Sequence, residues 1–324
     1  MNLGRRLRVP LALLAVVASA RARAADSAAP GRHAVGVTSL TFTKNSVTTG
    51  LPRPLDTTIW YPAALGTGTA EALGLRDADV YPKAFPLIVF SHGTCGRPSE
   101  ASYLTMGLAS RGFVVAAPAH LGNTKNDPMC GATANFIDSL QNRVPDVMFV
   151  IDSMLAETAD ASSRFADRLR TDAIGMSGLS YGGYTTLLAA QRDPRLRAAF
   201  AMVPGGVSVL DPKDITIPTM VLGAEHDRVV GFPDSVAAYG RIDAPRFLIE
   251  LLAADHLSVT DDCFPLCSPD YVPQATAHRI VLHFALTFFR YYLAQGHAQG
   301  AGLIRAVPGA ILTEDPRHAA GSDS

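Results

Sequence analysis

The sequence predicts an α/β fold with a doubly wound, mostly parallel β-sheet that helices cover on both faces. Three observations support this prediction: short apolar runs recur from residue 85 onward, helix-like stretches separate them, and two alternating stretches precede them. Strands of a parallel sheet are buried on both faces, so they read as near-continuous apolar runs. Regular alternation of such runs with helices indicates one sheet joined by right-handed crossovers.

The expected elements follow in chain order. Two partly alternating stretches, Val35 to Phe42 and Thr57 to Tyr61, predict an antiparallel entry to the sheet. The expected parallel strands are Pro86 to Phe90, Phe113 to Ala117, Ala173 to Met176, Ala198 to Val203, Thr219 to Leu222 and Phe247 to Leu252. The expected helices are Ser99 to Ser110, Val144 to Glu157, Tyr181 to Gln191, Pro233 to Tyr239 and Ala275 to Ala294.

Length and composition indicate one folded domain. The chain has 324 residues, 48% of them hydrophobic and 18% charged, and no interior linker or repeat divides it. Only 15 residues separate Val203 from Thr219, which is too few for a separate cap domain. We expect the domain to span residues 25–300. The tail, 301–324, contains only short apolar stretches such as Ala310 to Leu312 and is expected to be weakly ordered.

The N-terminus predicts export. Arginines within residues 1–8 precede the apolar run Val9 to Ala18, and Ala22-Arg23-Ala24 follows it, which is the order of a signal peptide covering residues 1–24. The run is short for a membrane span, although a retained anchor is the alternative, and the export route stays open. We expect a secreted or periplasmic protein without stable membrane insertion.

Charge and cysteine content narrow the class of partner. Removal of residues 1–24 leaves 23 basic and 29 acidic side chains, a net charge of −6 that is unfavourable for binding nucleic acid. Four cysteines in an exported chain favour disulfides over a zinc site, since no histidine or cysteine lies beside them at convincing zinc-ligand spacing.

A Gly-x-Ser-x-Gly motif, Gly178-Leu179-Ser180-Tyr181-Gly182, lies between an apolar run and a helical stretch. The pentapeptide alone is a weak signal, but its strand-turn-helix context matches a nucleophile held in a strained turn, where side chains two residues away would collide with neighbouring elements. Ser180 is the expected nucleophile, and the Tyr181 N–H at the helix start is an expected oxyanion donor. Ser177 has Leu179 in place of the second glycine and is interpreted as structural.

A serine nucleophile needs a histidine base and an acid that orients it, in the chain order Ser, acid, His. His256 and Asp227 both follow apolar runs at the carboxyl ends of expected strands, so they are the expected base and acid. His226 is an alternative base. Glu225 is an alternative acid, because carboxylates two positions apart can exchange that role.

The segment Ser91-His92-Gly93-Thr94 follows the first expected parallel strand. The backbone N–H of Thr94 is the expected second oxyanion donor, because a glycine beside it lets the backbone approach a substrate oxygen closely. An ordinary turn at the end of a strand is the alternative interpretation.

These residues resemble a known group of enzymes. The segments PLIVFSHG (86–93), LASRGFVVAAPAH (108–120) and GLSYGGY (178–184) are similar to those of α/β-hydrolases that include dienelactone hydrolases and platelet-activating-factor acetylhydrolases, and the layout resembles secreted cutinase-type polyesterases. The resemblance implies the α/β-hydrolase fold, with Ser180, His256 and the amides of Thr94 and Tyr181 in the roles given above. The sequence departs in one respect from platelet-activating-factor acetylhydrolases, because residues 201–206 offer no carboxylate. The resemblance therefore places the acid at Asp227, as in dienelactone hydrolases and cutinases.

Two disulfides are expected among the three possible connectivities. Cys95 follows one strand and Cys130 lies in the long loop after the strand Phe113 to Ala117, and these strands are neighbours in such a fold. Cys263 and Cys267 are close in sequence and form the second expected pair.

The sequence thus predicts a monomeric serine esterase that needs no metal or organic cofactor. Phe136, Phe264, Leu266 and Tyr271 lie in loops expected to wall the site, which suits esters with short or medium acyl chains and lipid-like or polyester-like substrates. The elbow SYGGY (180–184) also looks like that of prolyl-oligopeptidase-type peptidases, although the residues expected before the first core strand are too few for a β-propeller. A non-catalytic binding module is the third alternative.

Overall fold

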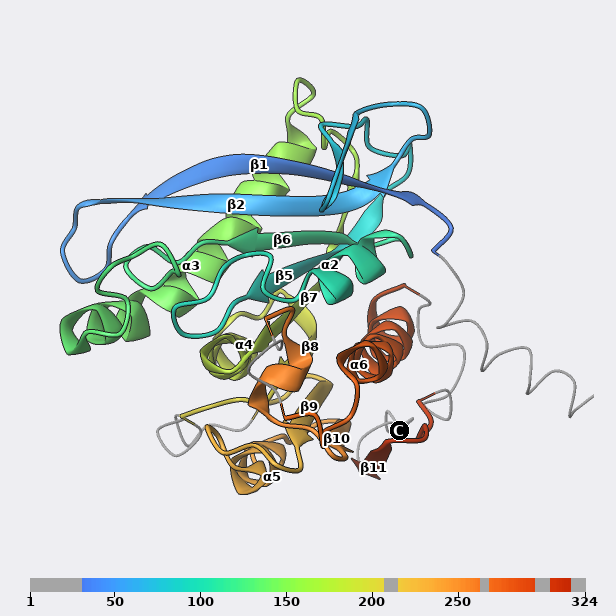
Figure 1. Ribbon diagram of the computed structural model, residues 1–324. Coiled ribbons are helices and arrows are strands. Elements are labelled where there is room, and N and C mark those ends of the chain that lie inside the picture. Colours follow the sequence, from blue (N-terminus) through green and yellow to red (C-terminus); the bar gives the residue numbers. More distant parts are fainter. Residues whose placement is uncertain (1–30, 207–214, 263–267, 295–303, 316–324) are drawn as a thin grey trace, which may run out of the picture. The chain divides into compact units, whose positions relative to one another are not determined.

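The computed structural model describes residues 31–206, 215–262, 268–294 and 304–315. The chain divides into two units, residues 1–30 and 31–324, and every described residue belongs to the second. The strands of these residues form an eleven-stranded mixed sheet in the order β11-β10-β9-β8-β7-β5-β6-β2-β1-β4-β3 (Figure 1). This sheet and its helices confirm the predicted α/β class.

The central strands run parallel, and antiparallel pairs occur toward both ends of the sheet. The parallel strands are β5 (Phe85–Ser91), β6 (Val114–Pro118), β7 (Leu169–Leu179), β8 (Leu196–Met202), β9 (Thr219–Ala224) and β10 (Arg246–Leu251). The antiparallel entry consists of β1 (Ala34–Asn45) and β2 (Pro52–Ala63), and β2 joins β6. The short antiparallel hairpin of β3 (Thr69–Glu71) and β4 (Gly74–Arg76) extends this end of the sheet, because β4 pairs in parallel with β1.

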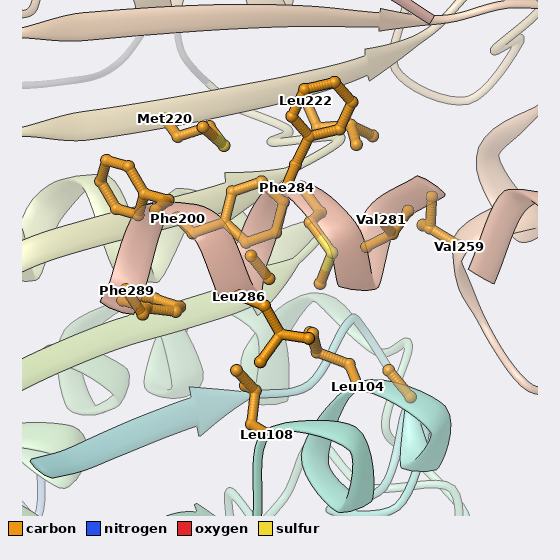
Figure 2. Packing of buried hydrophobic residues seen from close by; sticks show 14 of the residues in the cluster. Leu104, Leu108, Phe200, Met220, Leu222, Val259, Val281, Phe284, Leu286 and Phe289 are labelled. Carbon is orange, nitrogen blue, oxygen red and sulfur yellow. The ribbon is translucent and has the colours of Figure 1, made fainter. Parts of the chain in front are cut away.

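Helices cover both faces of the sheet because the central strands are apolar on both sides. In β5, Leu87 and Val89 belong to one buried cluster, whereas Ile88 and Phe90 belong to the other. The first cluster includes residues of α3 (Thr133–Ala159), α4 (Tyr181–Arg192) and α5 (Phe232–Tyr239), and the second includes residues of α2 (Ser102–Ala109) and α6 (Gln274–Phe289). Figure 2 shows the second cluster, in which α6 residues lie between strand side chains and leucines of α2.

Helix α3 begins at Thr133, eleven residues before the predicted start at Val144, and continues through Pro145. Its first turns are largely polar, so hydrophobic periodicity does not reveal them. Tertiary contacts stabilise them instead, because Ser139, Asn142 and Arg143 are buried and hydrogen-bonded.

Within the tail, residues 310–315 form a strand that the sequence did not predict, β11 (Ala310–Asp315), which pairs antiparallel with β10. Without a neighbour on its outer side, β10 would leave a row of backbone N–H and C=O groups unpaired. β11 pairs with these groups. Two shorter helices complete the described fold: the 3₁₀-helix η2 (His256–Val259) after β10 and the π-helix η3 (Arg290–Ala294) after α6. No helix among the described residues is both long and apolar enough to cross a membrane.

Candidate active site

Ser180 occupies a strained turn between β7 and α4. Its backbone has φ 54° and ψ −119°, a combination that residues with a Cβ rarely adopt. Cβ atoms at Gly178 or Gly182 would lie 2.7 Å or 1.9 Å from the Ser91 carbonyl oxygen at the end of β5. The turn therefore requires glycine at both positions, because α4 starts in direct contact with the neighbouring strand.

Backbone hydrogen bonds of Ser180 hold the turn, and its side-chain hydroxyl does not cap the helix. The Ser180 N–H donates to the Met202 carbonyl at 2.9 Å, and the Ser180 carbonyl accepts from Tyr184 at 3.0 Å and Gly205 at 3.3 Å. Serine at this position usually caps its helix with its hydroxyl. The Ser180 side chain makes no capping bond and is half-buried, so its hydroxyl is available at the edge of the sheet.

His256 and Asp227 form a buried pair. Asp227 Oδ2 lies 2.7 Å from His256 Nδ1, and each residue is 8% exposed. Asp227 Oδ1 accepts the N–H groups of Val229 and Val230, both at 2.8 Å, which fixes the carboxylate. A carboxylate is an acceptor, so Nδ1 donates, and the neutral imidazole keeps the lone pair of Nε2 as a proton acceptor.

The alternatives considered from the sequence lie elsewhere. Glu225 is exposed and accepts the Ala253 N–H at 2.7 Å. His226 is exposed and stacks on Tyr271, with 5.4 Å between ring centroids. Ser177 is fully buried in β7. Only Asp227, of the two acids, contacts His256 through a hydrogen bond in the described structure.

The serine and the His–Asp pair follow the carboxyl ends of strands in the same part of the sheet: Ser180 follows β7, Asp227 follows β9 and His256 follows β10. Strands β7, β8, β9 and β10 are consecutive in the sheet, and β8 contributes the segment between the two groups. Gly205 donates to the Ser180 carbonyl, and a Cβ on Gly205 would lie 3.2 Å from Val230, which is bonded to Asp227. In the described residues no hydrogen bond joins Ser180 Oγ to His256 Nε2.

The two expected oxyanion donors are Tyr181, which directly follows Ser180, and Thr94, which follows β5, the neighbour of β7 on the side away from β8. Tyr181 is the first residue of α4, where N–H groups have no acceptor within the helix. Thr94 is exposed and follows Gly93, whose N–H donates to the Glu100 carboxylate at 2.7 Å and whose carbonyl accepts from Arg143 at 3.0 Å. Burial raises the pKa of Glu100. The segment before Thr94 is thus held by buried side chains.

A disulfide between Cys95 and Cys130 ties this segment to the loop before α3, which confirms the predicted pair. Cys95 has a positive φ of 54°, and Gly96 forms a bridge with Thr124 of the same loop. The chain therefore holds the residue after Thr94 by a covalent bond. The predicted pair Cys263–Cys267 lies outside the described residues.

Of the aromatic residues expected to wall the site, Phe136 lies beside the elbow. Phe136 of α3 stacks on Tyr181 with 5.1 Å between ring centroids and is 41% exposed. Tyr271 packs on His226. Phe264 and Leu266, also expected to wall the site, lie outside the described residues. An apolar surface therefore continues from the start of α4 toward solvent.

Comparison with known proteins agrees with this geometry. The sequence pattern of a family described as PET hydrolase-like matches residues 79–263, more than half of the chain. The chain belongs to this family. The matched region contains Ser180, Asp227 and His256, and the match confirms the predicted resemblance to cutinase-type polyesterases.

Individual relatives of this PET hydrolase-like chain are hydrolases of esters by name. Cutinase est2 of Thermobifida alba is 30% identical over 55% of this chain and 56% of its own length. A bis(hydroxyethyl) terephthalate hydrolase of Streptomyces coelicolor is 27% identical over 53% of this chain and 44% of its own length. The chain thus spans about half the length of these relatives.

A solved structure supports the fold. Ferulic acid esterase from Streptomyces cinnamoneus superposes with a TM-score of 0.71 over 88% of this chain and 98% of its own, at 21% identity. Likeness at this identity establishes the shared α/β-hydrolase fold.

Sequence reasoning did not identify the buried polar groups under the oxyanion segment. Arg143 and Asn123 carry no motif, and His92 and His120 lie within the segments 86–93 and 108–120 that carry the resemblance but were given no role. The available signal was the combination of two histidines after adjacent strands with an arginine in a mostly polar helix start. Only the fold brings these residues into one network.

Proposed function

We propose that this chain is a serine hydrolase that cleaves carboxylic esters through an acyl-enzyme intermediate. The observation that carries the proposal is the 2.7 Å hydrogen bond from His256 Nδ1 to Asp227. This bond leaves Nε2 as a base, and His256 follows the carboxyl end of its strand, as Ser180 does. Membership of the PET hydrolase-like family supports it.

In the proposed mechanism, Ser180 Oγ attacks the ester carbonyl carbon while its proton passes to His256 Nε2. The N–H groups of Thr94 and Tyr181 stabilise the oxyanion of the tetrahedral intermediate. When the ester C–O bond breaks, His256 returns the proton to the leaving alkoxide. Water then hydrolyses the acyl-enzyme by the same steps and restores Ser180.

The proposed substrates are esters with short or medium acyl chains, including lipid-like or polyester-like esters. Phe136, stacked on Tyr181 and partly exposed, offers an apolar surface directly beside the proposed oxyanion hole. The names of the relatives, cutinase and bis(hydroxyethyl) terephthalate hydrolase, favour the same class.

A substrate panel tests the proposal. Purified protein is assayed on p-nitrophenyl acetate, butyrate, octanoate and palmitate beside aminoacyl and prolyl p-nitroanilides, with Ser180→Ala as the matched inactive control. We expect the highest kcat/KM on acetate to octanoate and little cleavage of the anilides. A higher kcat/KM on the anilides contradicts the ester assignment and favours a peptidase. No turnover of any substrate favours a binding module.

Export is a second part of the proposal. We propose that residues 1–24 direct the chain out of the cytoplasm, because the Cys95–Cys130 disulfide persists in oxidising compartments. N-terminal sequencing of the protein from the culture fluid or periplasm is expected to start at Ala25. Recovery of uncleaved protein in the reducing cytoplasm alone contradicts the proposal.

A further inference from the structure

A single buried guanidinium contacts both segments that carry the proposed oxyanion donors. Arg143 of α3 is 1% exposed. It donates to the carbonyls of His92 at 2.6 Å and Gly93 at 3.0 Å, and it lies 4.3 Å from the ring centroid of Tyr181. Its remaining acceptors are neutral side chains: Ser91 Oγ, Asn123 Oδ1 and Ser139 Oγ.

This charge is buried without a direct ionic partner. No carboxylate of the described residues lies within 4.0 Å of the Arg143 nitrogens, whereas Arg53, the next buried arginine, pairs with Asp146. Burial lowers the pKa of Arg143 to about 10, so it stays charged at neutral pH. Burying such a charge among neutral acceptors has an energetic cost, which a functional role would explain.

Arg143 is one of the groups that fix the direction of the Thr94 N–H. In a trans peptide, the Gly93 carbonyl and the Thr94 N–H point in opposite directions. The carbonyl accepts from Arg143 at 3.0 Å and from His92 Nδ1 at 2.8 Å in the buried network, and from the Gly96 N–H at 3.2 Å. The Thr94 N–H is therefore directed away from the network.

The tautomer of His92 follows from its second contact. The His120 N–H donates to His92 Nε2 at 3.2 Å, so this nitrogen is unprotonated and the proton lies on Nδ1. Burial and the nearby Arg143 charge lower the pKa of His92 and keep the ring neutral. The Arg143 guanidinium and His92 Nδ1, together with the Gly96 N–H, thus hold one peptide plane.

A second Ser-His-Asp chain lies under this segment and orients Arg143. Asp146 Oδ2 lies 3.0 Å from His120 Nδ1, and His120 Nε2 lies 2.9 Å from Ser91 Oγ; all three residues are fully buried. Asp146 accepts from Nδ1, so Nε2 must accept the Ser91 hydroxyl proton. The Ser91 oxygen is then free to accept from Arg143 at 3.2 Å. Burial excludes substrate from this chain, so its role is structural.

We propose that Arg143 is the positioning residue of the oxyanion hole. Arg143 holds the Gly93–Thr94 peptide by donating to the Gly93 carbonyl, and its guanidinium lies over the Tyr181 ring. These two contacts direct the N–H groups of Thr94 and Tyr181 toward one substrate oxygen. The inference rests on the proposed function, because it concerns the stabilisation of the same tetrahedral intermediate.

Steady-state kinetics on p-nitrophenyl butyrate test the role. We expect Arg143→Gln to lower kcat about 10- to 100-fold with KM within about twofold, since loss of one oxyanion donor lowers kcat about 10²- to 10³-fold and loosened donors retain part of their effect. Arg143→Lys keeps the charge but not the several fixed donors, and an intermediate kcat is expected.

Arg246→Gln is the matched control. Arg246 also lies over a tyrosine ring, 4.6 Å from the centroid of Tyr239, and donates to two backbone carbonyls, but it stands at the start of β10, at the end of the strand opposite His256. It is expected to leave kcat within about twofold of the parent value. Thermal unfolding of each variant measures the loss of stability separately.

A transition-state analogue separates positioning from general loosening. An alkyl boronic acid forms a tetrahedral adduct with the serine, so its Ki is expected to rise in Arg143→Gln by the same factor as kcat/KM falls, while KM stays constant. A stable Arg143→Gln protein with parental kcat and boronate Ki overturns the inference, as does a kcat loss matched by Arg246→Gln. If Arg143→Gln does not fold, Arg143→Lys with a parental boronate Ki overturns it. Absence of ester turnover by the parent protein instead contradicts the proposed function.

Discussion

Asp227 holds His256 by a 2.7 Å hydrogen bond, although the two residues lie 29 positions apart in the chain. The other oxygen of the same carboxylate accepts two backbone N–H groups, so the orientation of the carboxylate does not depend on the histidine alone. Glu225, two residues earlier, is directed to the Ala253 N–H instead. This difference in direction favours Asp227 over Glu225 as the proposed acid and leads to the first prediction.

We predict that Asp227→Asn lowers kcat on p-nitrophenyl butyrate by about 10⁴-fold, because an amide favours the wrong tautomer of His256. The folded structure is expected to persist, as measured by circular dichroism. Glu225→Gln is the matched control and is expected to change kcat by less than about threefold. A larger loss in the Glu225 variant contradicts the assignment of the acid.

Removal of the nucleophile or the base is predicted to abolish most turnover. Ser180→Ala and His256→Ala are each expected to reduce kcat by about 10⁴- to 10⁶-fold, and the double variant by little more, since triad residues act as a unit. Labelling by a fluorophosphonate probe is expected for the parent protein and not for Ser180→Ala. Equal labelling of Ser180→Ala and the parent protein would assign the nucleophile elsewhere.

The Cys95–Cys130 disulfide is predicted to stabilise the fold. The bond joins positions 35 residues apart, for which the chain-entropy relation gives about 4 kcal/mol. We expect the double variant Cys95→Ser/Cys130→Ser to lose about 2 to 4 kcal/mol of unfolding free energy in urea titration. An unchanged midpoint at the same m-value would contradict this.

The second pair, Cys263–Cys267, stays a prediction. Peptide mapping under non-reducing conditions is expected to find it beside Cys95–Cys130. Free thiols at positions 263 and 267 would contradict it.

The buried histidine His120 is predicted to make the fold sensitive to acid. Burial and the Arg143 charge lower the pKa of His120 from 6.5 to about 4, against the opposing effect of Asp146. The folded protein thus holds this ring neutral while the unfolded chain takes up a proton below pH 6.5, so the stability that depends on the neutral ring is complete above pH 6.5 and declines as the pH falls toward 4.

The expected loss from His120 across this interval is about 3 kcal/mol. Urea titrations at pH 7.5, 6.0 and 4.5 measure it. His120→Gln, which carries no ionisable ring, is expected to show a flatter dependence on pH whatever its absolute stability. An equally steep dependence in the variant would assign the effect to other groups.

The sequence by itself determined the features that local physical chemistry specifies. The strained turn at Ser180 requires glycine two residues away on either side, so the motif identifies it directly. Unbroken apolar runs specify strands buried on both faces, and the central parallel sheet follows from them. The Cys95–Cys130 pair follows from adjacent strands, because their loops meet at one edge of the sheet.

Tertiary structure decided what depends on contacts between distant segments. The choice of Asp227 over Glu225 depends on the direction of a turn, which neighbouring residues in sequence do not reveal. Strand β11 forms because β10 offers an unpaired edge, and the first turns of α3 form because polar side chains find buried partners there. The position of Arg143 beneath the Gly93–Thr94 peptide has the same origin: a lone arginine gains its role only from the acceptors that the folded chain brings around it.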